Sequence, residues 1–237
     1  MDGIISLAAI GAILLVCGLA LGIPDKQHFN MRWSLVALGL VIIEDALLTS
    51  GYGLLPNLIP GSWNWQGKGL ALIILLAIAA HSFFGWQRIG LTFRQRSGSL
   101  VSCLPVAAIY LLFFVALALA LPNETAAQED FAFQLTMPGI EEELFYRGLL
   151  LFALNEAFRR RWHFLGVDWG WGALLSSTAF GLAHAFGYGE SGFAFDPITF
   201  GLTAIPSLLG VWLRERSGSL LLPMIVHNGG NLLPMLL

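Results

Sequence analysis

Polar residues gather in three stretches that are otherwise apolar, and these stretches contain the side chains best suited to chemistry. The segment "EEELFYRGLLLFAL" (141–154) begins with three carboxylates and contains Arg147, whereas "STAFGLAHAFG" holds His184 and "PMIVHNGGNLLP" holds His227 and Asn231. Ionisable residues inside membrane helices usually face the interior of the bundle and mark a functional path. We therefore interpret the three stretches as parts of one candidate site.

Helical spacing gives neighbouring carboxylates different surroundings. Glu143 and Arg147 are four residues apart, so on a helix they share a face and can form an ion pair. Glu142 points about 100° away from Glu143, so it can stay free to face a cavity. His227 and Asn231 are also four residues apart, which places an imidazole and an amide on one face.

A carboxylate, two histidines and an amide in a secluded pocket form a set suited to hydrolysis. A glutamate can act as general base toward water, an imidazole can orient that water, and an imidazole–amide pair can stabilise a developing oxyanion. No Ser or Cys nucleophile is evidently paired with the histidines, which favours activated water. Gly229 and Gly230 would let another backbone or a substrate approach closely, because glycine has no side chain.

The elements that must position these residues are long apolar segments. Of the 237 residues, 57% are hydrophobic and 11% are charged, whereas soluble domains have about 25% charged residues. Apolar segments of about 20 residues cross a bilayer as helices, so we predict an all-α, polytopic membrane protein. The net charge of −3 says little about partners, and no basic run suggests nucleic-acid binding. Cys17 and Cys103 are interpreted as small core residues.

Eight spans are predicted, at about 4–23, 33–54, 68–85, 101–121, 141–159, 170–187, 196–213 and 219–236. The first is taken as a retained span because it lacks the basic beginning of a signal peptide. The joins alternate in charge: the first, third, fifth and seventh are basic, the second has only Lys68, and the fourth and sixth are acidic. Basic joins mark the cytoplasmic side, so both termini are predicted outside, with the three polar clusters toward the outer face.

At the same residues the sequence resembles a known family. "EELFYR" (142–147), "FGLAH" (180–184) and "HNGGN" (227–231) are similar to the signatures EExxxR, FxxxH and HxxxN of the CAAX-protease and bacteriocin-processing family of intramembrane proteases, which includes the type II CAAX prenyl endopeptidases. The resemblance covers roughly residues 101–237. It therefore divides the single membrane unit into N-terminal helices (1–100) and a catalytic core (101–237).

The resemblance implies roles for the motif residues. Glu142 matches the glutamate that activates water, and His184 matches the histidine that helps to hold it. His227 and Asn231 match the pair that stabilises the oxyanion. Glu143 and Arg147 match the glutamate and arginine that complete the first motif. Zinc would suit Glu142, His184 and His227 as ligands, but the spacing is not the HExxH of a zincin, so a mechanism without a cofactor is favoured over a metalloprotease.

The family's eukaryotic members trim prenylated proteins after the cysteine, on cytosolic tails, whereas the charge pattern places this site toward the outer face. We therefore expect a membrane-anchored protein or peptide as substrate, such as an exported polypeptide, and a prokaryotic cell membrane as location. Two other classes of function stay open: a non-catalytic immunity or peptide-binding protein, and a small transporter. The transporter predicts a continuous polar path and repeat symmetry, and the sequence shows neither.

Other polar residues have simpler interpretations. Glu44 and Asp45 could line the same cavity, but a polar pair near the end of a span is favoured. His81 is interpreted as structural or interfacial, and "RRRWHF" (159–164) as a determinant of topology. Glu141 has no assigned role.

Overall fold

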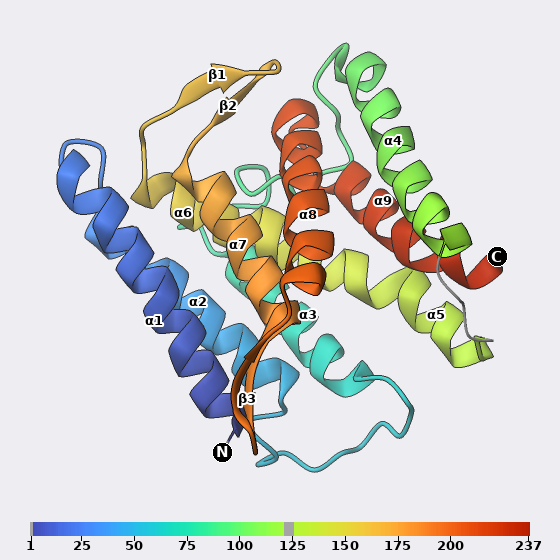
Figure 1. Cartoon of the computed structure of the whole chain (residues 1–237). Helices are drawn as coiled ribbons and strands as arrows, with labels where there is room; N and C mark the ends of the chain where they lie inside the picture. Colours follow the sequence, from blue (N-terminus) through green and yellow to red (C-terminus); the bar gives the residue numbers. More distant parts are fainter. Residues whose placement is uncertain (1, 121–125) are drawn as a thin grey trace.

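The computed structural model describes residues 2–120 and 126–237, which are mostly helical (Figure 1). The first helices are α1 (Asp2–Gly22), α2 (Met31–Leu48), α3 (Trp65–Ala80) and α4 (Ser99–Ala120). A continuous central helix follows, composed of α5 (Gln128–Met137), two π-helical segments (Pro138–Glu142 and Leu144–Leu150) and α6 (Leu151–Ala157). The last helices are α7 (Trp171–Ala185), α8 (Pro197–Ser217) and α9 (Leu221–Leu232), with short 3₁₀ turns at Ile23–Asp25 and Leu233–Leu236.

Each predicted span corresponds to a helix, and the largest error concerns the fifth. The central helix begins at Gln128 rather than near residue 141. Its first part, "QEDFAFQLTM", is too polar to be recognised by hydropathy, yet Phe133 is buried while the half-buried Glu129 and Asp130 accept hydrogen bonds from the segment before α3. The predicted boundary was therefore wrong because hydropathy marks where a helix becomes apolar rather than where it begins.

In the part of the chain that the structure describes, two segments are long and apolar enough to cross a membrane by length and composition alone, Asp2–Asp25 and Ser99–Ala120. Helix α3 is apolar but shorter. Eight membrane crossings therefore stay a prediction.

The chain is mostly helical, as predicted, but two of the joins also form β-hairpins. Strand β1 (Trp162–Phe164) pairs antiparallel with β2 (Val167–Trp169), and β3 (Phe186–Gly189) pairs antiparallel with β4 (Gly192–Phe195). The first hairpin turns through Leu165 and Gly166, which have φ angles of 52° and 76°. Positive φ at both central residues is the geometry of a tight two-residue turn, so the segment predicted as a topology determinant also contains a strand.

The basic joins meet at one end of the molecule, at the top of Figure 1, away from the N-terminus. Arg96 Nη1 donates to the carbonyl of Glu215 at 2.7 Å, and Arg214 Nη2 donates to the carbonyl of Arg88 at 2.9 Å. Arg160 and Asp25 form an exposed ion pair at 3.4 Å. These contacts link the first join with the fifth and the third with the seventh, as expected of joins on the same side.

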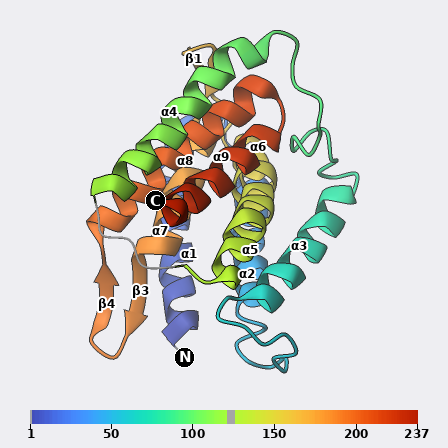
Figure 2. The same cartoon turned by 90° about the vertical axis from the view of Figure 1, so that its right-hand side faces the viewer.

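The central helix lies inside the bundle. Figure 2 shows it between α3 on one side and α4, α8 and α9 on the other. Leu144, Leu149 and Leu150 are among its most buried side chains and belong to the largest apolar cluster. Helices α7 and α8 pack closely: a Cβ on Gly181 would lie 2.8 Å from that of Ala204, an approach that small residues permit. Of the two cysteines, Cys103 is buried as predicted, but Cys17 is exposed on α1.

Candidate active site

The three adjacent carboxylates lie where the central helix widens into π-helical turns. Pro138 has no backbone N–H to continue an α-helical ladder, and the side chain of Asn228 on α9 bridges the altered backbone. Asn228 Oδ1 accepts from the Gly139 N–H at 2.7 Å, and its Nδ2 donates to the carbonyl of Leu135 at 2.7 Å. A Cβ on Gly139 would collide with Asn228 and with the carbonyl of Met224. The distortion thus requires a glycine and an amide from another helix.

The first carboxylate, Glu141, is turned away from the rest of the motif. Its side chain is fully buried, with Oε2 at 2.5 Å from Nζ of Lys68 on α3. Glu44 on α2 is also buried and lies close enough to interact electrostatically with Glu141. Glu141 therefore belongs to an internal cluster with Lys68 and Glu44.

The third carboxylate, Glu143, connects an arginine and a histidine. Glu143 Oε1 lies 2.8 Å from Arg147 Nη1, which confirms the predicted ion pair. The same oxygen lies 2.7 Å from His227 Nδ1. Because a carboxylate only accepts, Nδ1 carries the proton and Nε2 points the other way. The Arg147 guanidinium also stacks over the Phe180 ring, 4.4 Å from its centroid. Glu143 thus fixes the His227 ring, and Arg147 packs against the Phe180 ring.

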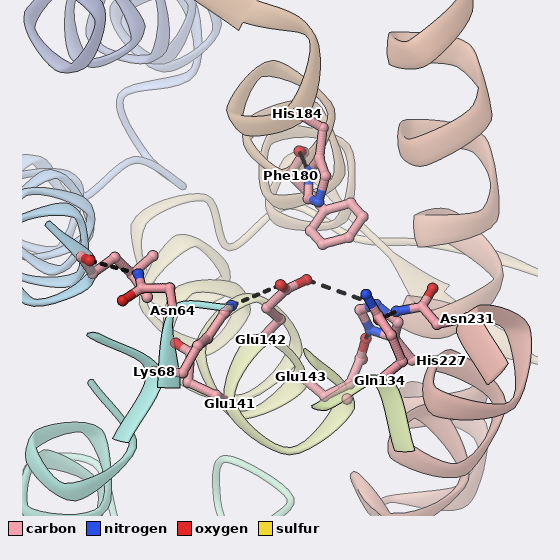
Figure 3. A network of polar contacts seen from close by, with 12 residues as sticks. Asn64, Lys68, Gln134, Glu141, Glu142, Glu143, Phe180, His184, His227 and Asn231 are labelled. Atoms are coloured by element: carbon pink, nitrogen blue, oxygen red, sulfur yellow. Dashed lines mark hydrogen bonds and ion pairs between the residues drawn. The ribbon is translucent and has the colours of Figure 1, made fainter. Parts of the chain in front are cut away.

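The second carboxylate, Glu142, lies between these two groups and faces the cavity (Figure 3). Its Oε1 accepts from Lys68 Nζ at 2.7 Å. Its Oε2 lies 3.7 Å from His227 Nε2, and no described residue hydrogen-bonds to it. One oxygen is therefore held by the protein and the other is directed at whatever occupies the cavity.

His184 lies across the cavity from Glu142, above the Phe180 ring in Figure 3. His184 Nδ1 donates to the carbonyl of Phe180 at 2.8 Å, because a carbonyl can only accept. This bond leaves Nε2 as the acceptor nitrogen of a neutral ring. The Phe180 ring packs 4.5 Å from His184 and 5.9 Å from His227, measured between centroids. Phe180, the first residue of the FxxxH pattern, thus packs against both imidazoles.

Asn231 extends the polar face of α9. Its Nδ2 donates to Gln134 Oε1 at 2.9 Å, which fixes the amide against α5. The intervening glycines do not face the cavity. A Cβ on Gly229 would lie 2.8 Å from Leu111, and one on Gly230 would lie 3.1 Å from Tyr110. The close approach that the sequence predicted is therefore made by helix α4.

One cavity of about 500 Å³ joins the polar clusters. Four of the predicted site residues line it, namely Glu142, His184, His227 and Asn231, whereas Glu143 and Arg147 lie beneath it. The three sequence stretches are thus brought together. Their catalytic roles stay predictions.

The sequence analysis did not identify several residues that line the cavity, because no motif or helical spacing marks them. They are Trp63, Asn64, Lys68, Tyr110, Gln134 and Thr203. Lys68 had one signal, as the only basic residue of its join. Its partners are 73 and 74 residues away in the chain, so no helical spacing could reveal them.

A zinc site needs three or four ligands gathered around one point. In residues 2–120 and 126–237, no group of three or more His, Cys, Asp or Glu side chains is arranged to hold a metal ion. Among these residues, Glu142 Oε2 and His184 Nε2 are free of hydrogen bonds, but together with His227 they are not gathered around one point. The arrangement as it stands does not fit a metal held by Glu142, His184 and His227.

The remaining polar residues have structural contacts. Tyr52 Oη donates to Asp45, so this carboxylate does not line the cavity. His81 Nδ1 accepts from the Phe83 N–H at 3.2 Å and is exposed, as the structural interpretation predicted. Glu44 differs from the prediction of an end-of-span pair, because it is buried beside Glu141.

The segment before α3 is fastened to the start of α5, outside the predicted spans. The Ser62 N–H donates to Glu129 at 3.0 Å. This hydrogen bond is the main reason that the pKa of Glu129 lies below its usual range. The indole N–H of Trp63, at 2.7 Å, does the same for the pKa of Asp130. The Trp63 ring stacks on Phe133 with centroids 4.8 Å apart. This wall of the cavity is thus positioned by ionised carboxylates.

Comparison with known families agrees with this geometry. The family described as "Rce1-like: Type II CAAX prenyl endopeptidase Rce1-like" matches residues 129–233, so a domain of this family occupies somewhat less than half of the chain. The resemblance drawn from the three motifs is thereby confirmed for this region. The family is membrane-embedded, and the match supports a CAAX-type protease. No curated protein and no solved structure matches the chain.

Proposed function

We propose that the chain is an intramembrane endopeptidase that hydrolyses a peptide bond in a membrane-associated protein or peptide. One observation carries the proposal: Glu142 is held by Lys68 through Oε1, while Oε2 faces the cavity 3.7 Å from His227 Nε2. A water molecule in the cavity can donate a hydrogen bond to this free carboxylate oxygen. The family match at residues 129–233 supports the same class of enzyme.

The proposed reaction begins with water held by Glu142 Oε2 and His184 Nε2. Glu142 removes a proton as the water oxygen attacks the carbonyl carbon of the scissile bond. Asn231 Nδ2 has a second proton to donate to the oxyanion, and a protonated His227 Nε2 supplies another hydrogen bond. The Glu143 carboxylate on Nδ1 stabilises that imidazolium. When the C–N bond breaks, Glu142 returns its proton to the leaving amine.

We further propose that the predicted spans form an eight-crossing bundle, with both termini outside a prokaryotic cell membrane. Two apolar segments and the clustering of the basic joins support this arrangement. The favoured substrate remains an exported, membrane-anchored polypeptide.

The experiment uses the purified full chain in lipid vesicles. The probes are an internally quenched peptide ending in a prenylated CAAX sequence and the same peptide without the lipid. We expect a new carboxyl terminus detectable by mass spectrometry, with His184→Ala and His227→Ala each reducing cleavage at least about 100-fold. Chelator at millimolar concentration should leave cleavage unchanged. Peptide that binds without being cleaved would instead indicate the non-catalytic peptide-binding protein.

A further inference from the structure

Lys68 is the one cation in direct contact with the carboxylate proposed as general base, among the residues that the structure describes. It lies on α3, outside the family match at residues 129–233. Its Nζ contacts Glu141 Oε2 at 2.5 Å and Glu142 Oε1 at 2.7 Å. We infer that Lys68 is a positioning residue, which keeps Glu142 ionised and directs its free oxygen into the cavity.

The position of Lys68 is itself fixed by the first turn of α3. Asn64 caps this helix: its Oδ1 accepts from the Gly67 N–H at 2.9 Å, and its Nδ2 donates to the carbonyl of Leu48 at 2.7 Å. The cap attaches the beginning of α3 to the end of α2. The Lys68 side chain is buried, so its ammonium reaches the two carboxylates from a rigid base.

Lys68 contacts only one of the two carboxylate oxygens of Glu142, which leaves the other oxygen free of hydrogen bonds from the described residues. If Oε1 is held, rotation of the carboxylate is restricted and Oε2 keeps a single direction, toward His227. Without Lys68, Glu142 and Glu141 would face each other as buried carboxylates with no shared cation. One of them would then take up a proton, because like charges in a buried site disfavour double ionisation. A protonated Glu142 cannot act as the base.

Glu141 has a different part in the cluster. It is fully buried, does not line the cavity and contacts the ammonium through Oε2. Glu141 therefore balances the charge of Lys68, whose position is set by the first turn of α3. If Lys68 and Glu141 were both replaced by neutral side chains, the charge would stay balanced. The contact that positions Glu142 would nevertheless be lost.

The inference rests on the proposed function, and three variants test it in the vesicle assay with the quenched prenylated peptide. Glu141→Gln keeps the Lys68–Glu142 contact, so we expect kcat within about threefold of the original chain. Lys68→Met removes the contact and leaves excess negative charge. The double variant Lys68→Met with Glu141→Gln removes one positive and one negative charge together, so it restores charge balance without restoring the contact.

We expect the double variant to recover the thermal stability lost in Lys68→Met, while kcat stays reduced about 100-fold or more with KM unchanged. Near-normal kcat in the double variant would overturn the inference, because Lys68 would then only balance charge. A raised KM with normal kcat would assign Lys68 to substrate binding, and a double variant that does not fold would assign it to structure; either result also overturns it. Full activity of Glu142→Gln would instead refute the proposed function itself.

Discussion

Replacing Glu143 by glutamine tests how much the buried ion pair beneath the cavity stabilises the folded protein. Glu143 Oε1 lies 2.8 Å from Arg147 Nη1 and 2.7 Å from His227 Nδ1, and the Glu143 and Arg147 side chains are 2% and 3% exposed. The substitution leaves the arginine charged and buried without its carboxylate. Breaking a buried pair in this way costs about 3–5 kcal/mol. At about 2–4 °C per kcal/mol for a chain of this size, the melting temperature should fall by about 6–20 °C.

The chain offers a matched control on the same helix. Glu156 and Arg159 form a glutamate–arginine pair at 3.5 Å, but their side chains are 33% and 57% exposed. Exposed pairs contribute about 0–1 kcal/mol, so Glu156→Gln should change the melting temperature by no more than a few degrees. Melting is followed by tryptophan fluorescence in the same detergent for both variants. Equal, small shifts would refute the view that Glu143 and Arg147 are coupled in a buried site.

Three further predictions concern the elements around the site. Asn228→Ala removes the side chain that bridges Gly139 and Leu135; leaving these groups unpaired should cost about 1–3 kcal/mol of unfolding free energy, measured by denaturant titration. The lowered pKa values of Glu129 and Asp130 predict a pH dependence: their stabilisation of segment 58–65 should be constant above about pH 5 and be lost as pH falls through the lowered values, below about 4. Protection of that segment from hydrogen exchange, relative to the free chain, should therefore be lower at pH 3 than at pH 7, and Glu129→Gln should lower it already at pH 7. A reporter enzyme inserted in the fourth join (122–130) should be active outside the cell, and a cytoplasmic signal there would reverse the predicted orientation.

The sequence allowed the helices to be predicted because membrane-type helices are defined by long apolar runs, and each run became a helix. Hydropathy could not show where the central helix begins, since Gln128–Met137 is amphipathic. Nor could it show the π-helical turns at Pro138–Glu142 and Leu144–Leu150, because these depend on an amide that α9 supplies from Asn228. The β-hairpins escaped notice because their strands are only three or four residues long.

The site could be located because ionisable residues are rare in this chain and gather in three stretches. Glu143 and Arg147 could be paired from their spacing, since both lie on one helix. The contacts of Glu143 with His227 and of Lys68 with Glu142 join helices that are far apart in sequence. A single sequence without its fold holds no record of such pairs. For the same reason, the sequence alone assigns no role to Glu141.

The central claim is that Glu142 activates the attacking water, and single-turnover hydrolysis by Glu142→Gln tests it most directly. Binding of the quenched prenylated peptide to vesicles containing the variant is measured separately, with Glu156→Gln as the control. Loss of a general base should slow the cleavage step by about 10²–10⁴-fold while peptide binding and the control rate stay unchanged. A cleavage rate in Glu142→Gln equal to that of the control would contradict the account.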